Sequence, residues 1–537
     1  AETGDPLPGA NVVIEGTNRG AATDPDGRFL IINVIPGTYN LRVQMMGYTP
    51  TVIQDVRVFS DRLRTINVEL SMTVLEGQEV VVVAGREVIE FDRTNTASYV
   101  SQEELDELPV QSLSQVIQLQ AGVVTGAGGD LHFRGGRTRE VAYMIDGVPV
   151  SNAFSQSGGS NVIVENNMVK ELQVITGTFN AEYGSAQSGI VNVVTKVPDQ
   201  EFKFTLDAIT GGFYSPNKPQ YIGLDTYNPL TQQELKFSVS GPLAFLNKLG
   251  VGKFGFFVNG RYVDDDGYLN GQRRFMPEDG WQIEVWREWY WATYDPPDPA
   301  IIPIPDSMHT GDESVVPINW HKRLSLNSKL VYQPFPALTA SYNLFMSDGS
   351  SKQYSWTWRF CPDALPFHYS DNWTHMFVIT HSPWENLFYN LRYSYQINHS
   401  KSYTYADAND PRYQEAAINA WDPGKTTGFD YGGIYSWDRR WEDRFVNLLN
   451  GDLTWQLNKV MEIKTGFEFK SHDIRYKNAP LREMQGYEIQ QFPYTMNEIR
   501  GYELPWEYFL EATRNYEFGT IRLRESSPDS LDDHQIY

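Results

Sequence analysis

The sequence has 537 residues, 41% of them hydrophobic, and this size predicts more than one globular domain. The formal net charge of −23 excludes a nucleic-acid partner, because binding to phosphates needs a basic surface. A single cysteine, Cys361, excludes both an internal disulfide framework and a cysteine-rich metal site. No run reaches the ~18 consecutive apolar residues of a membrane-spanning helix.

Residues 1–78 predict a small β-sandwich. Short β-rich runs such as "NVVIEG" and "RTINVEL" alternate with Gly, Pro and Asp turns. The stretch from "GDPLPGANVVIEG" to "NLRVQMMGY" resembles the carboxypeptidase regulatory-like domain, a transthyretin-like β-sandwich found in front of many outer-membrane receptors. Members of that family usually have a further strand before "PLPGA", so we expect the domain to begin before this sequence. The chain lacks an H-E-x-x-H motif, and peptidase activity is not implied.

Residues 85–200 mix helix and strand signals. Ser101 followed by Glu104 predicts a capping box at a helix start. The run "QSLSQVIQLQAGV" predicts a short amphipathic helix that Gly122 ends. Strand-like pieces interrupted by glycines follow, so we expect an α+β domain here.

Ordered motifs in this region resemble the plug domain of TonB-dependent outer-membrane transporters. They are "FRGGR" (Phe133–Arg137), "YMIDGVPV" (Tyr143–Val150), "VKELQVITG" and "AEYGSAQSGIVNVVTK" (Ala181–Lys196). Where the glycan-importing subgroup usually reads "KDASATAIYG", this chain reads "GTFNAEYGSAQSG", which looks more like the Oar-like receptors. The resemblance marks these plug residues: Arg134, Gly135, Gly136, Arg137, Asp146, Gly147, Tyr183 and Gly184.

The glycines among these residues have a structural interpretation, since Gly reaches positive φ and lets backbones approach closely. Direct contact with a ligand is the alternative. Arg134, Arg137 and Arg139 either pair with acidic residues of a barrel wall and hold the plug, or form a solvated charge cluster.

Four consecutive valines lie between the two domains, in "EVVVVA" (Glu79, Val80, Val81, Val82, Val83 and Ala84). In the resembling receptors this place holds the TonB box, an extended peptide that pairs as an added strand with the periplasmic domain of TonB. β-branched side chains favour the extended state that such pairing needs. The alternative is a last strand of the sandwich or a buried strand of the plug.

From residue 201 the sequence alternates with period two. In "NLFYNLRYSYQIN", the residues Leu387, Tyr389 and Leu391 share one face, while Asn390, Arg392 and Gln396 share the other. The same pattern recurs at 202–208, 235–241, 254–262, 324–332, 338–346, 448–456 and 461–469, with a weaker example at 375–381. One face suits lipid and the other suits water.

Short links such as "QPFPA" and "SPWEN" alternate with long segments at roughly 264–320, 347–372 and 402–440. Short turns on one side and long loops on the other are typical of a bacterial outer-membrane barrel, which spans lipid without an apolar 20-mer. About nine or ten strands fit here, against about 22 in plugged transporter barrels. We therefore expect the rest of the wall to lie outside this sequence.

The long loops offer weaker signals. Trp281, Trp286, Trp289 and Trp291 stand beside carboxylates and either stack on a sugar or peptide ligand or pack the loop onto its neighbours. "DDD" at 264–266 is either a divalent-cation site or a solvated loop tip. No G-x-S-x-G or P-loop motif is present, so we expect neither an enzyme nor a cofactor.

The fold class expected is mainly β, in four parts: a sandwich at 1–78, a TonB box at 79–84, a plug at 85–200 and a transmembrane β-barrel at 201–537. The function expected is TonB-driven import of an unidentified extracellular ligand through plug rearrangement. The implied partners are the TonB periplasmic domain and outer-membrane lipid, with a surface lipoprotein as a further candidate. The implied location is the outer membrane, with the sandwich and TonB box in the periplasm. The alternative is an Oar-like surface-structural, adhesion or protein-export barrel.

Overall fold

The computed structural model describes the chain from residue 4 to residue 478 with gaps. The described ranges are 4–17, 19–60, 63–72, 80–83, 96–110, 112–126, 130–152, 158–177, 183–184, 186–218, 220–279, 309–407, 432–436, 438–457 and 461–478, with a few single residues. Beyond these lie four short strands, β24 (Leu481–Met484), β25 (Glu488–Gln491), β26 (Ile521–Leu523) and β27 (His534–Ile536). The fold is mainly β, as the sequence predicts, and three main sheets build it.

The amino-terminal sheet has five strands in the order β2-β1-β3-β4-β5. Their bounds are β1 (Asn11–Ile14), β2 (Gly20–Ala22), β3 (Gly37–Gln44), β4 (Thr51–Val58) and β5 (Val80–Val83). Val12, Leu41 and Ile53 form its buried core, and Phe29 and Ile66 from segments outside the strands pack against it. One face of the sheet is therefore covered by extended chain rather than by a second paired sheet among the described residues.

The valine segment forms β5, at one end of this strand order. It pairs in parallel with β4, in the register Thr51 with Val80 through Gln54 with Val83. The other strand pairs of the sheet are antiparallel. The structure thus places the four valines in the last strand of the amino-terminal sheet, which is one of the alternatives to a TonB box that the sequence left open.

The second domain contains a five-stranded sheet in the order β10-β9-β12-β11-β6. Only the β9–β12 pair is parallel. Two short helices pack beside the sheet, and Ser101 and Glu104 form the predicted capping box of the first. The bounds are β6 (Ala97–Ser101), α1 (Gln102–Glu107), α2 (Leu113–Gln118), β7 (Val123–Thr125), β8 (Leu131–Phe133), η1 (Thr138–Glu140), β9 (Val141–Ile145), β10 (Val148–Pro149), η2 (Asn166–Met168), β11 (Val169–Ile175) and β12 (Gly189–Thr195).

The third and largest unit is a nine-stranded sheet, hereafter the wall, in which every neighbouring pair is antiparallel. Every alternating segment predicted from the sequence matches one of its strands to within one residue. These are β13 (Lys203–Gly211), β14 (Gln232–Pro242), β15 (Lys253–Asp265), β18 (His321–Phe335), β19 (Leu338–Lys352), β20 (Phe367–Trp384), β21 (Leu387–Tyr403), β22 (Arg440–Gln456) and β23 (Glu462–Asn478).

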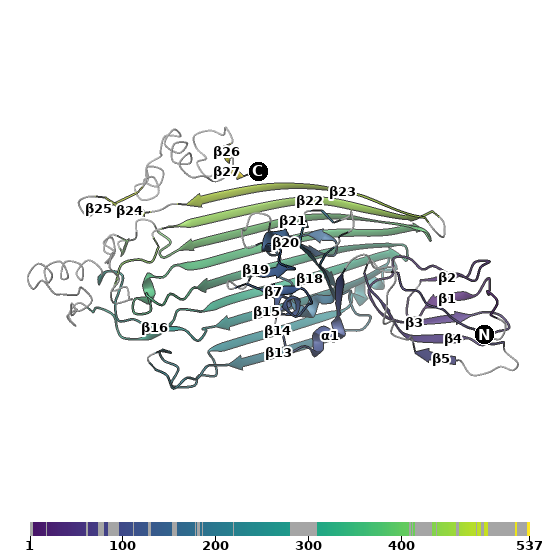
Figure 1. Ribbon diagram of the computed structural model, residues 1–537, viewed down its shortest axis with the longest axis horizontal. Coiled ribbons are helices and arrows are strands. Elements are labelled where there is room, and N and C mark those ends of the chain that lie inside the picture. Colours follow the sequence, from purple (N-terminus) through teal and green to yellow (C-terminus); the bar gives the residue numbers. More distant parts are fainter. Residues whose placement is uncertain are drawn as a thin grey trace, which may run out of the picture.

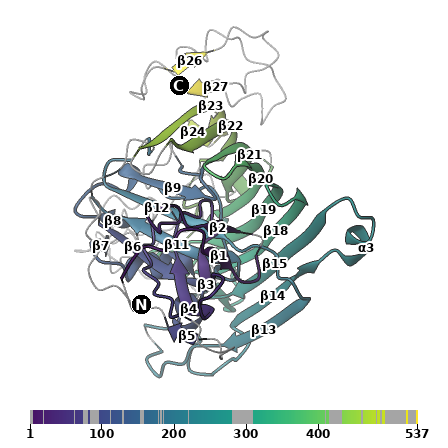
Figure 2. The ribbon, with the colours of Figure 1, turned by 90° about the vertical axis from the view of Figure 1, so that its right-hand side faces the viewer.

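The wall curves around the second domain, which lies on its concave side (Figure 2). Long connections leave the end of the wall opposite to the amino-terminal sheet (Figure 1). They carry the hairpin β16 (Asn270–Gln272) and β17 (Val315–Pro317) and the turn η5 (Pro362–Ala364). The connections at the other end are short, and the longest of them holds α3 (Ala244–Asn247). This confirms the predicted alternation of short and long links.

Period-two alternation separates the two faces of the wall. The concave face presents Ser394 and Gln396 of β21, both buried, toward the second domain, whereas Leu391 and Tyr393 point outward and are exposed. In the described part of the chain, no helix is long and apolar enough to cross a membrane.

We expect the capping box of α1 to contribute measurably to the free energy of unfolding. Ser101→Ala removes the hydroxyl that accepts a hydrogen bond from the Glu104 amide, and should lower the free energy of unfolding by about 1 kcal/mol. Urea unfolding followed by circular dichroism measures this change. Ser400→Ala, at an exposed serine of β21, is the control and should change stability by less than about 0.5 kcal/mol. Equal stability of the two variants would contradict the capping assignment.

Candidate functional site

The contact between the second domain and the wall centres on the turn that joins β9 to β10. Ile145 pairs with Val148, so Asp146 and Gly147 are the two residues of a tight hairpin turn. Their φ angles are 49° and 77°, the positive values that a type I′ turn requires and that an Asp-Gly sequence favours. A Cβ atom on Gly147 would lie 2.9 Å from the Arg392 guanidinium carbon. Gly147 therefore provides both the turn geometry and the close approach of the wall.

The Asp146 carboxylate is the most densely bonded group of this turn. It accepts hydrogen bonds from the Thr195 amide at 2.8 Å and the Thr195 hydroxyl at 2.6 Å. From the wall, Lys329 Nζ on β18 lies 3.1 Å from the same carboxylate and 2.6 Å from Thr195 Oγ1. The Asp146 and Lys329 side chains are 12% and 8% exposed, so solvent screens their attraction little.

Burial by itself would raise the pKa of Asp146, because it disfavours the charged form. The attraction of Lys329 and the hydrogen bonds from Thr195 and Lys329 outweigh this effect, and the pKa lies below its ordinary value. Asp146 is therefore a carboxylate at neutral pH, and its pair with Lys329 joins the second domain to the wall.

Three more wall residues hold the backbone of the same hairpin. Arg392 Nε on β21 donates to the Asp146 carbonyl at 3.0 Å, while its guanidinium also pairs with Asp452 of β22. Asn450 on β22 donates to the Gly147 carbonyl at 3.0 Å, and Gln396 donates to the Pro149 carbonyl at 3.1 Å. The carbonyls of one hairpin thus receive donors from two adjacent wall strands.

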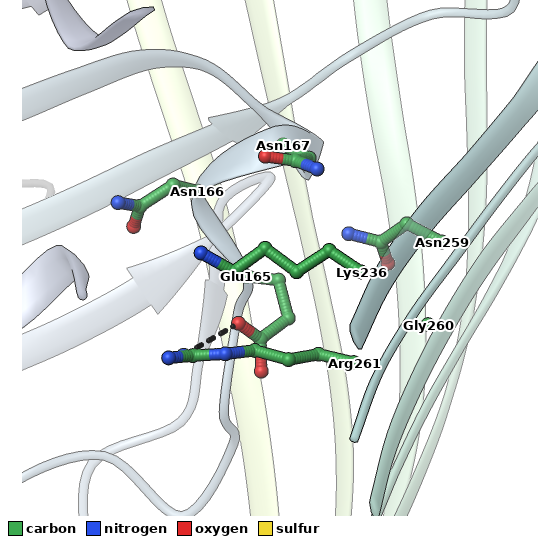
Figure 3. Close-up of a pocket in the computed structure, with 7 residues that line it drawn as sticks. All are labelled: Glu165, Asn166, Asn167, Lys236, Asn259, Gly260 and Arg261. Carbon is green, nitrogen blue, oxygen red and sulfur yellow. Dashed lines mark hydrogen bonds and ion pairs between the residues drawn. The ribbon is translucent and has the colours of Figure 1, made fainter. Parts of the chain in front are cut away.

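A second polar contact joins Glu165, just before η2, to Arg261 of β15 (Figure 3). Arg261 donates two hydrogen bonds to Glu234 of β14, at 2.9 and 3.1 Å, and a third to Glu165 at 3.1 Å. The paired bonds to Glu234 fix the plane of the guanidinium before it meets Glu165. A cavity of about 10 Å³ beside this pair has room for about one water molecule, so we interpret the contact as an anchor and not as a ligand site.

Apolar packing surrounds these polar contacts. Phe257 of β15, Phe345 of β19, Met376 of β20 and Leu448 of β22 belong to the same buried cluster as the core of the second domain. The second domain and the wall therefore share one hydrophobic core, which the polar contacts interrupt at defined points.

The amino-terminal sheet also contacts the second domain. Its Arg57 lies 3.4 Å from Glu104 of α1. The Ser60 amide donates to the buried Glu171 carboxylate of β11 at 3.1 Å, and the rings of Phe59 and Tyr99 are 5.0 Å apart. Arg57 lies near the end of β4, the strand that pairs with the valine segment, and Phe59 and Ser60 follow directly after it.

The predicted ion pairs of Arg134, Arg137 and Arg139 with acidic residues of the wall are absent among the described residues, which corrects that interpretation. The polarity is reversed, since the wall supplies the cations Lys329 and Arg261 and the second domain supplies the carboxylates. The physical reason is that "FRGGR" lies beside Gly122 and Gly177 of its own domain, where Arg134 packs.

The structure explains some of the other plug-motif residues but not all of them. Gly135 has a φ of 79°, and a Cβ on Gly136 would lie 2.2 Å from Ser188 Cβ, so both glycines are structural as predicted. Gly184 is exposed with open space around its Cα, and the structure gives no reason for a glycine there. Tyr183 packs against the cluster that contains Ile175 and Ile190.

Several predicted site residues fall outside the described residues. These are Glu79 and Ala84 of the valine segment and the four loop tryptophans, Trp281, Trp286, Trp289 and Trp291. Asp264 of the "DDD" run pairs with Lys322 at 2.9 Å, and Asp265 accepts hydrogen bonds from Gln232 and Gly267. Within the described ranges, no three His, Cys, Asp or Glu side chains are grouped as a metal site.

The structure thus has a small α+β domain on the concave face of a curved antiparallel sheet. Family models match this domain and the amino-terminal sheet. The family model of the CarboxypepD_reg-like domain matches residues 1–82, and that of the TonB-dependent receptor plug domain matches residues 90–191. The chain therefore carries these two domains in that order and is related to TonB-dependent receptors. From here on the second domain is called the plug.

Its relatives include the TonB-dependent transporter Oar of Myxococcus xanthus, 25% identical over 210 residues, which are 36% of this chain and 20% of that protein. The TonB-dependent receptor SusC of Bacteroides thetaiotaomicron is 28% identical over 209 residues, again 36% of this chain and 20% of the relative. The chain thus covers about a fifth of the length of these curated relatives.

Solved structures with a similar arrangement include the ferric citrate transporter FecA and the siderophore receptor PirA from Pseudomonas aeruginosa. FecA aligns with a TM-score of 0.47 and 13% identity, over 74% of this chain and 50% of its own. PirA aligns with a TM-score of 0.43 and 14% identity, over 72% of this chain and 51% of its own.

The ion pair of Lys329 with Asp146 should contribute far more to stability than an exposed pair on the same strand. Lys329→Met leaves a buried carboxylate without its cation and should cost about 3 kcal/mol. Lys322→Met, whose pair with Asp264 is half exposed, is the matched control and should cost less than about 1 kcal/mol. Urea unfolding of both variants measures the difference, and equal losses would show that the buried pair does not anchor the plug.

The lowered pKa of Asp146 predicts an acid-sensitive plug contact. A carboxyl whose pKa is depressed in the folded protein stabilises the fold above its ordinary value of 3.8, and that stability is lost as pH falls through the lower folded value. We expect the melting temperature of the wild type to fall more steeply below pH 4 than that of Asp146→Asn. Differential scanning calorimetry from pH 7 to pH 3 tests this, and parallel curves for the two proteins would refute it.

Proposed function

We propose that this protein is a TonB-dependent outer-membrane transporter that takes up a ligand from the extracellular side. In this proposal the ligand binds above the plug, the TonB complex pulls from the periplasm, and the plug rearranges to open a path along the wall. The observation that carries the proposal is the polar attachment of the Asp146–Gly147 turn to β18, β21 and β22. A plug held in this way is ordered at rest and is joined to the wall at separable points.

The polar character of the attachment suits a plug that has to move. Asp146, Gly147 and Pro149 accept bonds from four wall side chains, and each of these side chains can be solvated once water enters. The net contribution of one hydrogen bond to stability is only about 1 kcal/mol, because bonds to water replace it when it breaks. Breaking the bonds one at a time therefore needs less work than separating a wholly apolar interface at once.

A mechanical route joins the valine segment to this turn. In the amino-terminal sheet β5 pairs with β4, and the residues after β4 contact Glu171 of β11. Within the plug, β11 pairs with β12, and β12 pairs with β9, whose last residue, Ile145, directly precedes Asp146. We propose that TonB engages Val80–Val83, and that tension on this strand reaches the Asp146–Gly147 turn by this route and through the chain that follows β5.

The outward face of the wall supports the membrane location. Outward-pointing Phe377, Ile379 and Tyr393 are exposed, although their size and apolarity suit lipid and not water. Exposed Trp384 lies beside the short turn after β20, the position of an interfacial aromatic belt. In the proposed orientation the amino-terminal sheet faces the periplasm and the long connections face outward.

The alternative function is an Oar-like surface-structural, adhesion or protein-export barrel. The TonB-dependent transporter Oar is among the relatives by sequence. The two functions differ in their need for the valine segment. Proline at Val81 or Val82 abolishes uptake in the transporter and has no effect on a purely structural surface protein.

Binding of TonB tests the proposal directly. A peptide spanning Gln78 to Arg86 should bind the purified periplasmic domain of TonB, because extended β-branched residues suit strand addition. A scrambled peptide and a peptide with Val81→Pro and Val82→Pro are the controls and should bind at least tenfold more weakly. Isothermal titration calorimetry provides the measurement. Equal affinity of the native and scrambled peptides would remove the proposed site of energy coupling.

A further inference from the structure

A second cavity lies at the end of the wall that carries the long connections. Its volume is about 190 Å³. Three strands and two connections line it, and it is far larger than the space beside Arg261. The cavity is large enough for one small ring compound.

Its floor is a row of three side chains on adjacent strands. His368 of β20 is directly opposite Ser402 of β21, and Ser402 is directly opposite Arg440 of β22. Buried Thr374 and Leu448 have the same parity as His368 and Arg440 on their strands, so the row lies on the concave face. A ligand in this cavity would therefore be inside the wall.

The cavity lies close to the plug. Arg444 of β22 contacts Asn152 of the plug. Arg440 is four residues farther along the same strand, a distance of about 13 Å at about 3.3 Å per residue. The cavity is thus on the side of the plug that faces away from the amino-terminal sheet.

The connections that roof the cavity are held by a small core of their own. Ile318, Cys361 and Leu365 in this core are at most 1% exposed. The Tyr435 amide donates to the Ala364 carbonyl at 3.1 Å, and Lys352 Nζ donates to the Pro362 carbonyl at 2.8 Å. These contacts place Tyr354 and Tyr435 over the cavity before any ligand arrives, which lowers the entropic cost of binding.

The charges of the lining cancel. Arg440 pairs with Asp438 at 2.6 Å, so the guanidinium and the carboxylate neutralise each other within the lining. The remaining polar groups, which include Gln353, His368 and Ser402, offer both donors and acceptors. Among the described lining residues, a ligand with a full charge would meet no unpaired opposite charge, whereas hydroxyl groups both donate and accept.

We infer that this cavity binds a neutral polyhydroxylated ring, such as one pyranose unit of a carbohydrate. Its hydroxyls would bond to the Arg440–Asp438 pair, His368 and Ser402, and its apolar face would contact Tyr354 or Tyr435. The inference rests on the proposed transporter function and names the chemical class of its ligand.

Saturation-transfer NMR on the purified full chain in detergent tests this inference. The probes are the methyl glycosides of glucose, galactose and mannose, each compared with its uronic acid and its amino sugar. At least one neutral glycoside should bind, and its two charged counterparts should bind at least tenfold more weakly. A uronic acid or amino sugar that binds more tightly would overturn the assignment to a neutral ligand, and so would the absence of binding by every neutral probe.

Matched variants locate the binding. Arg440→Gln and Asp438→Asn each break the pair in the cavity and should weaken binding at least tenfold. Arg475→Gln is the control, since Arg475 forms a similar pair with Asp473 at 3.1 Å on the outward face of β23 and should not affect binding. Equal effects at Arg440 and Arg475 would contradict the site. The measurement needs no TonB, so its failure leaves the peptide experiment above as an independent test of the proposed function.

Discussion

The arrangement of plug and wall depends on a buried carboxylate that is satisfied from both sides. Asp146 receives two hydrogen bonds from Thr195 within the plug and an ion pair from Lys329 of the wall. Neither half of the contact is stable alone, because a buried charge without its partner is costly. The position of the plug inside the wall is therefore coupled to the ionisation of one side chain, and the surrounding hairpin bonds align the turn on which that side chain sits.

The same contact explains why the plug combines an apolar core with polar attachment points. The shared cluster around Phe345 and Met376 supplies non-directional stabilisation, which would tolerate small shifts of the plug. The bonds to Asp146, Gly147 and Glu165 have fixed directions and define one position. In the proposed transporter the apolar core keeps the plug folded while the polar points determine when it leaves the wall.

The sequence predicts the fold well wherever local periodicity is sufficient. Alternation located all nine wall strands, and the Ser101–Glu104 pair located α1, because both signals act within a few residues. The motif "YMIDGVPV" also marked Asp146 and Gly147, through its resemblance to the plug family. Their partners were harder to find, since Lys329 and Arg261 are ordinary polar positions of alternating strands until the fold brings them to the plug. Arg392 and Gln396 were placed on the water-facing side, yet nothing local assigned them to one hairpin.

The double-mutant cycle of Asp146→Asn with Lys329→Met tests the central claim most directly, because it isolates the coupling between the two side chains from the effect of each alone. The account predicts a coupling free energy of about 2 kcal/mol or more in urea unfolding. The same cycle on the exposed pair of Asp264 and Lys322 should give less than about 0.5 kcal/mol. A coupling for Asp146 and Lys329 no larger than that of the exposed pair would contradict the role of this contact in holding the plug.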